Sequence, residues 1–403
     1  MSVLNILEEK LAETKKQGRF REFLNLERGV QDKPWATSHG HQGERRLNVW
    51  CSNDYLAMSH HPKVLLATTE AVNRVGLGTC GARSISGTSV YHSELETLLA
   101  SAYGKESALL FTTGFGANDA TLSTLCDAIP DLIVFSDELN HASMIYGIRY
   151  SKAEKKIFRH NDVAHLAELL QAADPARPKL IAFESLYSMD GDFAPLAQIV
   201  ALAEQYQALT YLDEIHSSGV YGERGLGYAE QLGLLDKITI IQGGFGKSYG
   251  AAGGYIAAPR SVVEAVRSWA PAFVFSTSSP APVVAAALAS FKYNLEHDTQ
   301  RKHLLAIVDH LKTGLRAAGI PLVSADSHIL PLRVGDPHRN KHISKVLLDE
   351  HDIYVQPVNA PTVPAGSERL RVTPTSAHSH ADGETFLAAL GRVWAANDLR
   401  RAG

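Results

Sequence analysis

The chain has 403 residues, of which 45% are hydrophobic and 20% are charged, and its formal net charge is −4. A chain of this length can bury a large core and form two or three domains, which excludes a single small module. Lys and Arg are spread along the sequence and do not outnumber Asp and Glu, so no basic face for nucleic acid or anionic lipid is expected. We therefore expect small-molecule chemistry.

Cysteine content and hydropathy indicate the compartment. The three cysteines, Cys51, Cys80 and Cys126, lie far apart and form no CxxC pair, so no disulfide framework is expected. The N-terminal segment has no long apolar stretch, and the most apolar run, 281–288, is far shorter than the ~18 residues that a membrane-spanning helix needs. The sequence predicts a soluble cytoplasmic protein with no membrane partner.

The N-terminal segment, 1–45, is expected to be helical at its start. Leu4, Leu7 and Leu11 recur at helical spacing. Two lysines follow where the last turn would lie, and Gly18 then provides a stop. This pattern predicts an amphipathic helix ahead of the main domain.

From Leu109 onward, short apolar runs of strand length are separated by helical stretches such as 163–172 and 196–207. This alternation is typical of βαβ units around a largely parallel sheet that is covered on both faces. We expect a large α/β domain over residues 46–290. The runs of strand length are 108–113, 132–137, 179–185, 208–214, 238–244 and 253–259.

The pattern changes after residue 290. A long helix is followed by two short runs of strand length, 328–334 and 369–374. A closing helix completes the chain, and these changes predict a smaller α+β domain over residues 291–403. The apolar residues on one face of that helix are Phe386, Leu390, Val393 and Trp394.

Chemically reactive residues follow two neighbouring predicted strands. Asp213 ends one strand, and His216 comes three residues later. The next strand ends in the glycine-rich turn 243–246, which leads directly to Lys247. Parallel strands carry their carboxyl ends to one edge of a sheet, so we expect these residues to meet there.

A nucleotide-binding P-loop is one interpretation of this pattern. Lys247 and Ser248 would then hold phosphates, and the strand end 213–216 would bind a metal. However, P-loop spacing requires glycine at position 241, where the chain has Ile241, and the lysine loop should precede the acidic strand. The segment after Lys247 is also too rich in glycine to open a phosphate-binding helix. The sequence disfavours this interpretation, and no metal site is expected.

Pyridoxal phosphate fits these residue types better. Its aldehyde needs an amine, and burial readily lowers the pKa of a lysine such as Lys247, which can then act as nucleophile and base. Its ring nitrogen must stay protonated, which a buried carboxylate such as Asp213 secures. His216 is placed to bond the ring oxygen. A satisfied polar residue at a strand end would explain one of these three residues but not all of them.

Nine segments of the chain resemble the α-oxoamine synthases, a fold-type-I pyridoxal-phosphate family, in the same order and at the same spacing. The resemblance implies a large domain with a mostly parallel seven-stranded sheet and a smaller α+β domain. Within the family, the likeness is strongest to the 5-aminolevulinate synthase branch, through 18–23, 184–192 and 355–366. The nine segments are 50–62, 78–96, 111–120, 136–151, 184–196, 211–222, 244–256, 275–280 and 369–378.

The resemblance implies an activity: decarboxylating condensation of an amino acid, with glycine favoured, and an acyl-CoA, with succinyl-CoA favoured. The products would be 5-aminolevulinate or a related aminoketone, carbon dioxide and coenzyme A. Other members of the family stay open as alternatives, namely a synthase of a specialised pathway, an 8-amino-7-oxononanoate synthase or a 2-amino-3-ketobutyrate CoA ligase. A pyridoxal-phosphate aminotransferase or lyase would use the same lysine.

The resemblance also assigns cofactor contacts. His141 matches the histidine that stacks on the cofactor ring, and Ser188 matches a residue near the ring oxygen. Gly114 and Phe115 match the turn whose backbone N–H groups hold the phosphate. The expected catalytic residues are therefore His141 and the pair already found from the strand pattern, the lysine and the aspartate.

Two further pairs of residues are assigned in the same way. Ser276 and Thr277 match residues that reach the phosphate from the neighbouring subunit, which implies a homodimer with shared active sites. Asn53 and Arg371 match groups around the amino-acid substrate, with Arg371 as the expected clamp on its carboxylate. An arginine that alternates with apolar residues in a strand is otherwise explained as a solvent-facing charge.

The acyl side shows both agreement with the family and departures from it. Arg21 matches the arginine that receives the succinyl carboxylate, which favours a polar acyl tail over a fatty chain. Ala82 and Ser84 replace the threonine and asparagine expected around the acyl end, and Ala360 replaces a tyrosine. Gly244 replaces a threonine that usually binds the phosphate, a loss of roughly 1.5–3 kcal/mol for a hydrogen bond to a charged group.

Overall fold

The computed structural model describes residues 2–40, 43–397 and 399, and its chain forms two compact units. Neither unit is a continuous stretch of sequence, so the domain limits expected after residues 45 and 290 stay predictions. Unit 1 comprises Met1–Tyr55, Ser188–Asp192 and Lys302–Gly403, and unit 2 comprises Leu56–Tyr187 and Phe193–Arg301.

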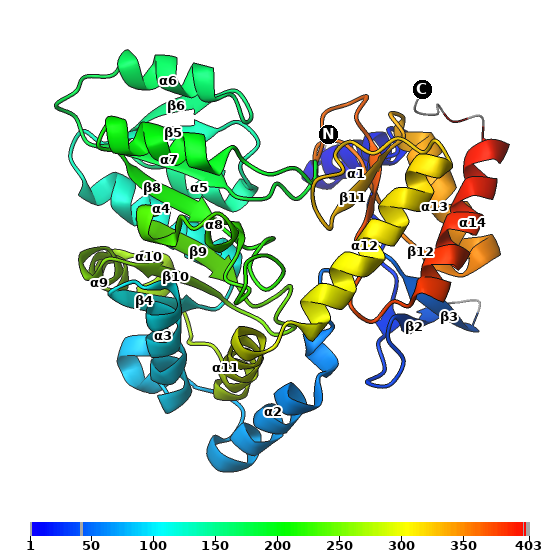
Figure 1. Cartoon of the computed structure of the whole chain (residues 1–403), viewed down its shortest axis with the longest axis horizontal. Helices are drawn as coiled ribbons and strands as arrows, with labels where there is room; N and C mark the ends of the chain where they lie inside the picture. The colour runs from blue at the N-terminus through cyan, green and yellow to red at the C-terminus, as the bar shows by residue number, and fades with distance from the viewer. Residues whose placement is uncertain (1, 41–42, 398, 400–403) are drawn as a thin grey trace. The chain divides into compact units, whose positions relative to one another are not determined.

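Unit 2 is built on a seven-stranded sheet with the order β4-β10-β9-β8-β7-β5-β6 (Figure 1). Strand β10 runs antiparallel to both of its neighbours, and the other neighbouring pairs are parallel. The prediction of a mostly parallel seven-stranded sheet is therefore confirmed. The strands are β4 (Ser107–Phe111), β5 (Ile133–Asp137), β6 (Glu154–Phe158), β7 (Lys179–Glu184), β8 (Leu209–Asp213), β9 (Ile240–Gly244) and β10 (Gly254–Ala258).

Successive residues of the central strands face two different apolar cores. In β5, Ile133 and Phe135 pack into one core and Val134 into the other, and all three are buried. Because helices cover both faces, the strands are continuous apolar runs, which is why the sequence predicts them well. One face is covered by α3 (Val90–Tyr103), α6 (Val163–Gln171), α7 (Leu196–Gln205) and α11 (Ala281–Glu296), and the other by α4 (Gly114–Ala128), α5 (Ala142–Arg149), α9 (Arg260–Trp269) and α10 (Pro271–Val274).

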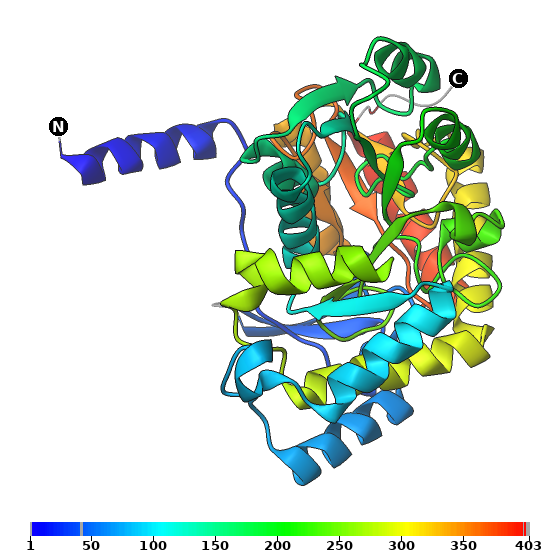
Figure 2. The same ribbon diagram turned by 90° about the vertical axis from the view of Figure 1, so that its left-hand side faces the viewer.

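Shorter elements complete unit 2. Helix α2 (Pro62–Val75) lies along α11 (Figures 1 and 2). The turn Arg83–Gly87 precedes α3, and the short helix α8 (Tyr228–Gln231) follows the loop after β8. Among the described residues, no helix combines the length and the apolar character that crossing a bilayer requires.

Unit 1 contains two small sheets. The first has the order β1-β2-β3-β12 and combines N-terminal strands with a strand from the C-terminal part of the chain, because β12 pairs in parallel with β3. The second is antiparallel, with the order β11-β14-β13. The strands are β1 (Leu26–Glu27), β2 (Trp35–Gly40), β3 (Gly43–Val49), β11 (Leu330–Arg333), β12 (Ile353–Tyr354), β13 (Gln356–Val358) and β14 (Arg369–Val372).

Helices α12 (Thr299–Ala317), α13 (Pro337–His351) and α14 (His380–Ala396) account for the rest of the C-terminal part. The predicted closing helix is α14, and its four predicted core residues are all buried. Among them, Phe386 stacks on the buried Trp50 at 4.5 Å between ring centroids. The small α+β arrangement expected at the C-terminal end is therefore present.

The N-terminal segment is helical only at its start. Helix α1 (Val3–Lys16) forms as predicted, but the residues after it build strands β1 to β3. These strands carry many polar residues, so their apolar pattern is weak in sequence. Strand β6 was missed for the same reason: it lies at the sheet edge, where charged side chains are common.

Candidate active site

The carboxyl edge of the unit 2 sheet gathers polar residues from five strands. Thr113 follows β4, His141 follows β5, Glu184 and Asp213 end β7 and β8, and Lys247 follows β9. The sheet order places the ends of β7, β8 and β9 side by side. The sequence predicted this gathering for Asp213 and Lys247, and ligands of open α/β sheets bind at this edge.

Asp213 is a buried carboxylate, with 2% of its surface exposed. Its Oδ2 accepts a hydrogen bond from Asn118 Nδ2 at 2.7 Å, and its Oδ1 accepts one from the backbone N–H of Ile215 at 2.9 Å. No lysine or arginine of the described chain forms an ion pair with it. Because a buried charge is costly without an opposite charge, this carboxylate is suited to pair with a cationic ligand group.

Lys247 and His216 are in direct contact. The amine Nζ lies 2.6 Å from the ring atom Nε2. Lys247 is half-buried at the end of the glycine-rich turn, and His216 is buried in the loop after β8. The two residues that the sequence predicted from neighbouring strand ends are thus brought together, and the amine is in hydrogen-bond contact with an imidazole nitrogen.

His141 is held in place by three contacts with two residues, Ser143 and Glu184. It caps the N-terminus of α5, where Ser143 N–H donates to its Nδ1 at 3.2 Å and Ser143 Oγ lies 2.7 Å from the same atom. The His141 backbone N–H donates to Glu184 Oε1 at 2.6 Å. Because Nδ1 accepts, the ring proton is assigned to Nε2, which leaves that N–H as a donor.

The protonation state of His141 follows from its surroundings. Burial lowers the pKa of its ring, the nearby Lys247 charge lowers it further, and the Asp213 carboxylate opposes both effects. The imidazole is therefore neutral at neutral pH, with one donor and one acceptor nitrogen.

A buried hydrogen-bond network that the sequence analysis missed links two of the three predicted catalytic residues, Asp213 and His141. Asn118 Nδ2 donates both to Asp213 and to Ser143 Oγ, the latter at 2.9 Å. Tyr211 donates its hydroxyl to Asn118 Oδ1 at 2.7 Å. Asn118 and Ser143 both lie inside segments that carried the family resemblance, so the signal was present, but nothing in the sequence pairs them across 25 residues.

Glu184 is a second buried carboxyl group that the sequence analysis did not select. It ends β7 directly opposite Asp213 in the strand register, and 3% of its surface is exposed. Burial raises its pKa well above the ordinary value, and the Asp213 charge raises it further. Burial and the Asp213 charge therefore favour the protonated form of Glu184, and the Lys247 charge opposes them.

The predicted phosphate turn lies at the start of α4. Thr113 caps the helix, since its Oγ1 accepts the Gly116 N–H at 2.9 Å. The first N–H groups of a helix have no partner within it and attract anions, and here they belong to Gly114 and Phe115. The exposed Phe115 ring lies nearly perpendicular to the His141 ring, with an interplanar angle of 78° and the ring centroids 6.3 Å apart.

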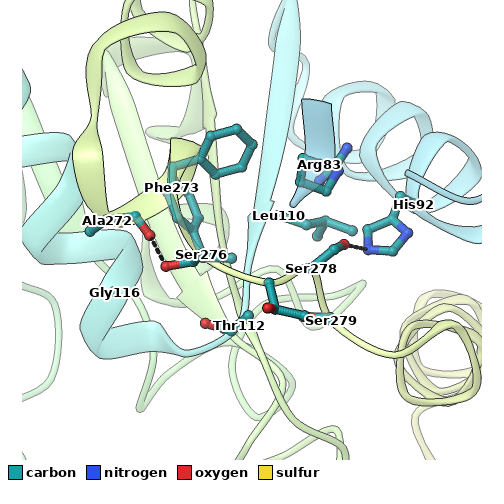
Figure 3. Close-up of a pocket in the computed structure, with 12 residues that line it drawn as sticks. Arg83, His92, Leu110, Thr112, Gly116, Ala272, Phe273, Ser276, Ser278 and Ser279 are labelled. Carbon is teal, nitrogen blue, oxygen red and sulfur yellow. Dashed lines mark hydrogen bonds between the residues drawn. The ribbon is translucent and has the colours of Figure 1, made fainter. Parts of the chain in front are cut away.

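Ser276 and Thr277 lie on a segment that lines a small pocket beside the start of α4 (Figure 3). Ser276 Oγ donates to the carbonyl of Ala272 at 2.5 Å, and Thr277 is exposed. The backbone of Thr277 forms a bridge with Ala82. A predicted phosphate contact and a predicted acyl-side residue are thus neighbours, and Ser84 is exposed in the turn that follows.

The predicted carboxylate clamp belongs to unit 1. Arg371 is buried in β14 with 8% of its surface exposed, so it is not a solvent-facing charge. Its guanidinium donates to the Ser188 carbonyl at 2.7 Å, to Asn53 Oδ1 at 3.0 Å and to the Tyr55 hydroxyl at 3.3 Å. These acceptors are neutral, and no carboxylate of the described chain pairs with Arg371. By contrast, Arg369 pairs with Asp190 at 2.7 Å.

The predicted acyl-side arginine also belongs to unit 1. Arg21 is exposed, and its guanidinium donates to Thr362 Oγ1 at 3.0 Å. Arg19 donates to the carbonyl of Ala360 at 3.1 Å. The segment with Arg21 therefore lies against the turn in which alanine replaces the expected tyrosine, which brings two sequence-predicted acyl-side positions together.

Comparisons with known proteins add to this geometry. Residues 46–390 match the family model described as aminotransferase class I and II. A 5-aminolevulinate synthase of Rhodobacter capsulatus is 49% identical over 395 residues, which covers 96% of this chain and 95% of that protein. One of Paracoccus denitrificans is 49% identical over 399 residues, which covers 98% of each. A solved serine palmitoyltransferase (SPT) with its PLP internal aldimine matches with a TM-score of 0.93 and 31% identity, covering 99% of this chain and 100% of that one.

Proposed function

The chain belongs to the aminotransferase class I and II family and, within it, to the 5-aminolevulinate synthases, and on this premise we propose that it joins glycine to succinyl-CoA. The products are 5-aminolevulinate, coenzyme A and carbon dioxide. The reaction needs pyridoxal phosphate, so the protein is a pyridoxal-phosphate-dependent acyltransferase of tetrapyrrole biosynthesis.

One observation carries this function. Strands β8 and β9 deliver Asp213 and Lys247 to the same edge of the sheet, and His216 touches the lysine amine at 2.6 Å. Asp213 is buried without a cationic partner in the described chain, which fits a site for the protonated ring nitrogen of pyridoxal phosphate. The N–H groups at the start of α4 fit its phosphate.

Pyridoxal phosphate supplies an aldehyde that bonds to the substrate amine and a protonated ring that draws electrons from the α-carbon. Lys247 would hold the cofactor covalently and would then serve as the base for the α-proton. Asp213 would keep the ring nitrogen protonated. His141 would lie beside the cofactor ring, and its Nε2–H would donate to the thioester carbonyl oxygen as negative charge develops there.

The unit 1 residues supply binding groups for two carboxylates. Arg371, held by Asn53 and the Ser188 carbonyl, binds the carboxylate of glycine. Arg21 binds the carboxylate of the succinyl group, and Ala82 and Ser84 contribute to the acyl side. Because Arg371 is buried beside neutral acceptors only, an incoming carboxylate supplies the charge that the folded chain lacks.

A homodimer in the cytoplasm is part of the proposal. Ser276 and Thr277 would reach the phosphate of the partner subunit, and the exposure of Thr277 supports a contact of this kind. Cys51, Cys80 and Cys126 are free thiols, which fits a reducing compartment.

The proposed function is tested by mixing the purified protein and pyridoxal phosphate with glycine, alanine or serine and a series of acyl-CoAs. We expect free thiol and 5-aminolevulinate, identified by mass spectrometry, from glycine with succinyl-CoA. A pair of substrates other than these that reacts while glycine and succinyl-CoA stay inert would overturn the substrate assignment. Amino-group transfer without thiol release would overturn the reaction class.

A second experiment tests the lysine. Borohydride reduction of the holoprotein followed by peptide mapping should place the cofactor label on Lys247. The variant Lys247→Ala should lose the label and all turnover, whereas Lys237→Ala, at an exposed lysine of the same unit, should keep both. A label on another lysine, or a fully active Lys247→Ala protein, would refute the assignment.

A further inference from the structure

The side chain of Ile215 packs directly on two glycines at the carboxyl edge of the unit 2 sheet. A Cβ atom added at Gly114 would lie 2.6 Å from Ile215 Cδ1. A Cβ atom added at Gly244 would lie 2.7 Å from the same atom and 2.8 Å from Ile215 Cγ1. Carbon atoms in contact lie ~3.5–4 Å apart, so Ile215 occupies the space that side chains at both positions would need.

Lack of space for a side chain, and not backbone conformation, explains why these two positions are glycine. Neither Gly114 nor Gly244 has a positive φ, so their backbones would accept other residues. Gly246, in the same turn, also lacks a positive φ, and a Cβ atom there would meet nothing within 4 Å. The restriction at Gly244 is therefore specific to its contact with Ile215.

Gly244 is the stricter of the two positions. At Gly114 the added Cβ atom clashes only with the terminal atom Cδ1 of Ile215, which can rotate aside. Ile215 Cγ1 is 4.0 Å from the added Cβ atom, an ordinary contact distance. At Gly244 both Cδ1 and Cγ1 are too close, so rotation of the terminal atom alone does not make room. A side-chain hydroxyl at position 244 is excluded while Ile215 keeps its place.

Ile215 is also fixed at its backbone. Its N–H donates to Asp213 Oδ1 at 2.9 Å, so the residue that fills the space at Gly114 and Gly244 is bonded to the buried carboxylate. The position of Ile215 therefore depends on Asp213, and a shift of the Ile215 backbone would lengthen the hydrogen bond to that carboxylate.

We propose that Ile215 is a positioning residue that forms an apolar wall of the cofactor phosphate site and directs the phosphate to the backbone N–H groups at the start of α4. This inference rests on the proposed function. It implies that residues 215 and 244 are coupled: a hydroxyl at position 244 improves phosphate binding only when the side chain at position 215 is shortened.

The test is a double-mutant cycle with Gly244→Ser and Ile215→Ala, and with Gly246→Ser as the matched control. Two quantities are measured on each protein: the Kd of pyridoxal phosphate for the apoprotein and the Tm of the apoprotein. We expect Gly244→Ser to weaken cofactor binding about tenfold or more and to lower Tm by roughly 2–5 °C. Gly246→Ser should change neither quantity.

The double variant decides the inference. Adding Ile215→Ala to Gly244→Ser should restore both cofactor affinity and Tm, although Ile215→Ala alone lowers Tm by removing buried carbon atoms. Additive effects would overturn the inference, as would a Gly244→Ser protein that binds the cofactor as tightly as the parent. Gly244→Ala, which adds the Cβ atom alone, replaces Gly244→Ser if that variant fails to fold.

The same measurements separate this inference from the proposed function. If the parent apoprotein does not bind pyridoxal phosphate, the proposed function fails, while the Tm values still test the packing of Ile215 on Gly244. If the parent binds the cofactor but the two substitutions are uncoupled, only the inference fails.

Discussion

Glu184 and Asp213 stand opposite each other at the ends of two neighbouring parallel strands, and both carboxyl groups are buried. Two like charges so placed would repel strongly in a poorly solvated site. Asp213 accepts hydrogen bonds on both oxygens, and Glu184 accepts the backbone N–H of His141. Burial and the neighbouring Asp213 carboxylate both raise the pKa of Glu184, so the protonated form of Glu184 is favoured in this pair.

The first prediction concerns the pH dependence of stability. Burial and the Asp213 charge raise the pKa of Glu184, with the Lys247 charge opposing them, whereas in the unfolded chain this glutamate loses its proton above a pH of about 4.3. Folding then takes up a proton, and the unfolding free energy falls with rising pH by up to ~1.4 kcal/mol per pH unit until the raised pKa is passed. Glu184→Gln removes this titration and keeps an acceptor for His141.

Urea unfolding of the apoprotein at several pH values between about 5 and 8 measures the effect. The unfolding free energy of Glu184→Gln should rise relative to the parent as the pH increases. Glu168→Gln, at an exposed position on α6, should follow the parent throughout. A constant difference between Glu184→Gln and the parent across this range would show that Glu184 is ionised in the folded state.

The second prediction concerns Asn118, which bonds to Asp213, Ser143 and Tyr211. Asn118→Ala removes one hydrogen-bond partner from each of these three buried groups, at a cost of about 1–3 kcal/mol in unfolding free energy. Cofactor affinity should fall about tenfold or more, because Asp213 and the Ser143–His141 pair lose their common support. Equilibrium titration of the apoprotein measures this.

A buried asparagine elsewhere in the same unit provides the control for Asn118. Asn294 lies on α11, where its Nδ2 donates to the Ser290 carbonyl at 2.9 Å. Asn294→Ala should reduce stability and leave the Kd of pyridoxal phosphate unchanged. If both alanine variants weaken cofactor binding equally, Asn118 has a structural role only.

The sequence predicted the parts of this molecule that depend on local patterns. Buried strands such as β7 are continuous apolar runs, and Asp213 and Lys247 follow two of them directly, so their meeting could be inferred from topology. The network around Asn118 could not, because it depends on which side chains of α4 and α5 meet across the core. The packing of Ile215 on Gly244 could not be predicted either, because the sequence does not show which neighbouring residue would exclude a side chain at a glycine position.

The third prediction compares two arginines of β14. Arg371 has neutral partners only, whereas Arg369 is paired with Asp190. Arg371→Gln removes the proposed clamp and should raise the KM for glycine about 10- to 100-fold, the equivalent of a charge-assisted hydrogen bond of about 1.5–3 kcal/mol. Steady-state kinetics with saturating succinyl-CoA measures this change.

Arg369→Gln should behave in the opposite way. It leaves Asp190 without its buried partner, so it should lower Tm. The KM for glycine should stay close to that of the parent. A rise in KM for Arg369→Gln as large as that for Arg371→Gln would mean that both changes act through the fold of β14 and not through a carboxylate site.

The last prediction concerns the acyl tail. Arg21 is exposed and donates to Thr362, so its charge is accessible to a substrate carboxylate. Arg21→Leu should lower kcat/KM for succinyl-CoA about tenfold or more, while kcat/KM for an uncharged acyl-CoA of similar length should hold or rise, because an apolar tail no longer faces a guanidinium. Arg19→Leu is the control, since Arg19 is bonded to the Ala360 carbonyl of the same turn. If Arg19→Leu changes the ratio of the two kcat/KM values as much as Arg21→Leu does, then general loss of positive charge explains the effect, and the assignment of Arg21 fails.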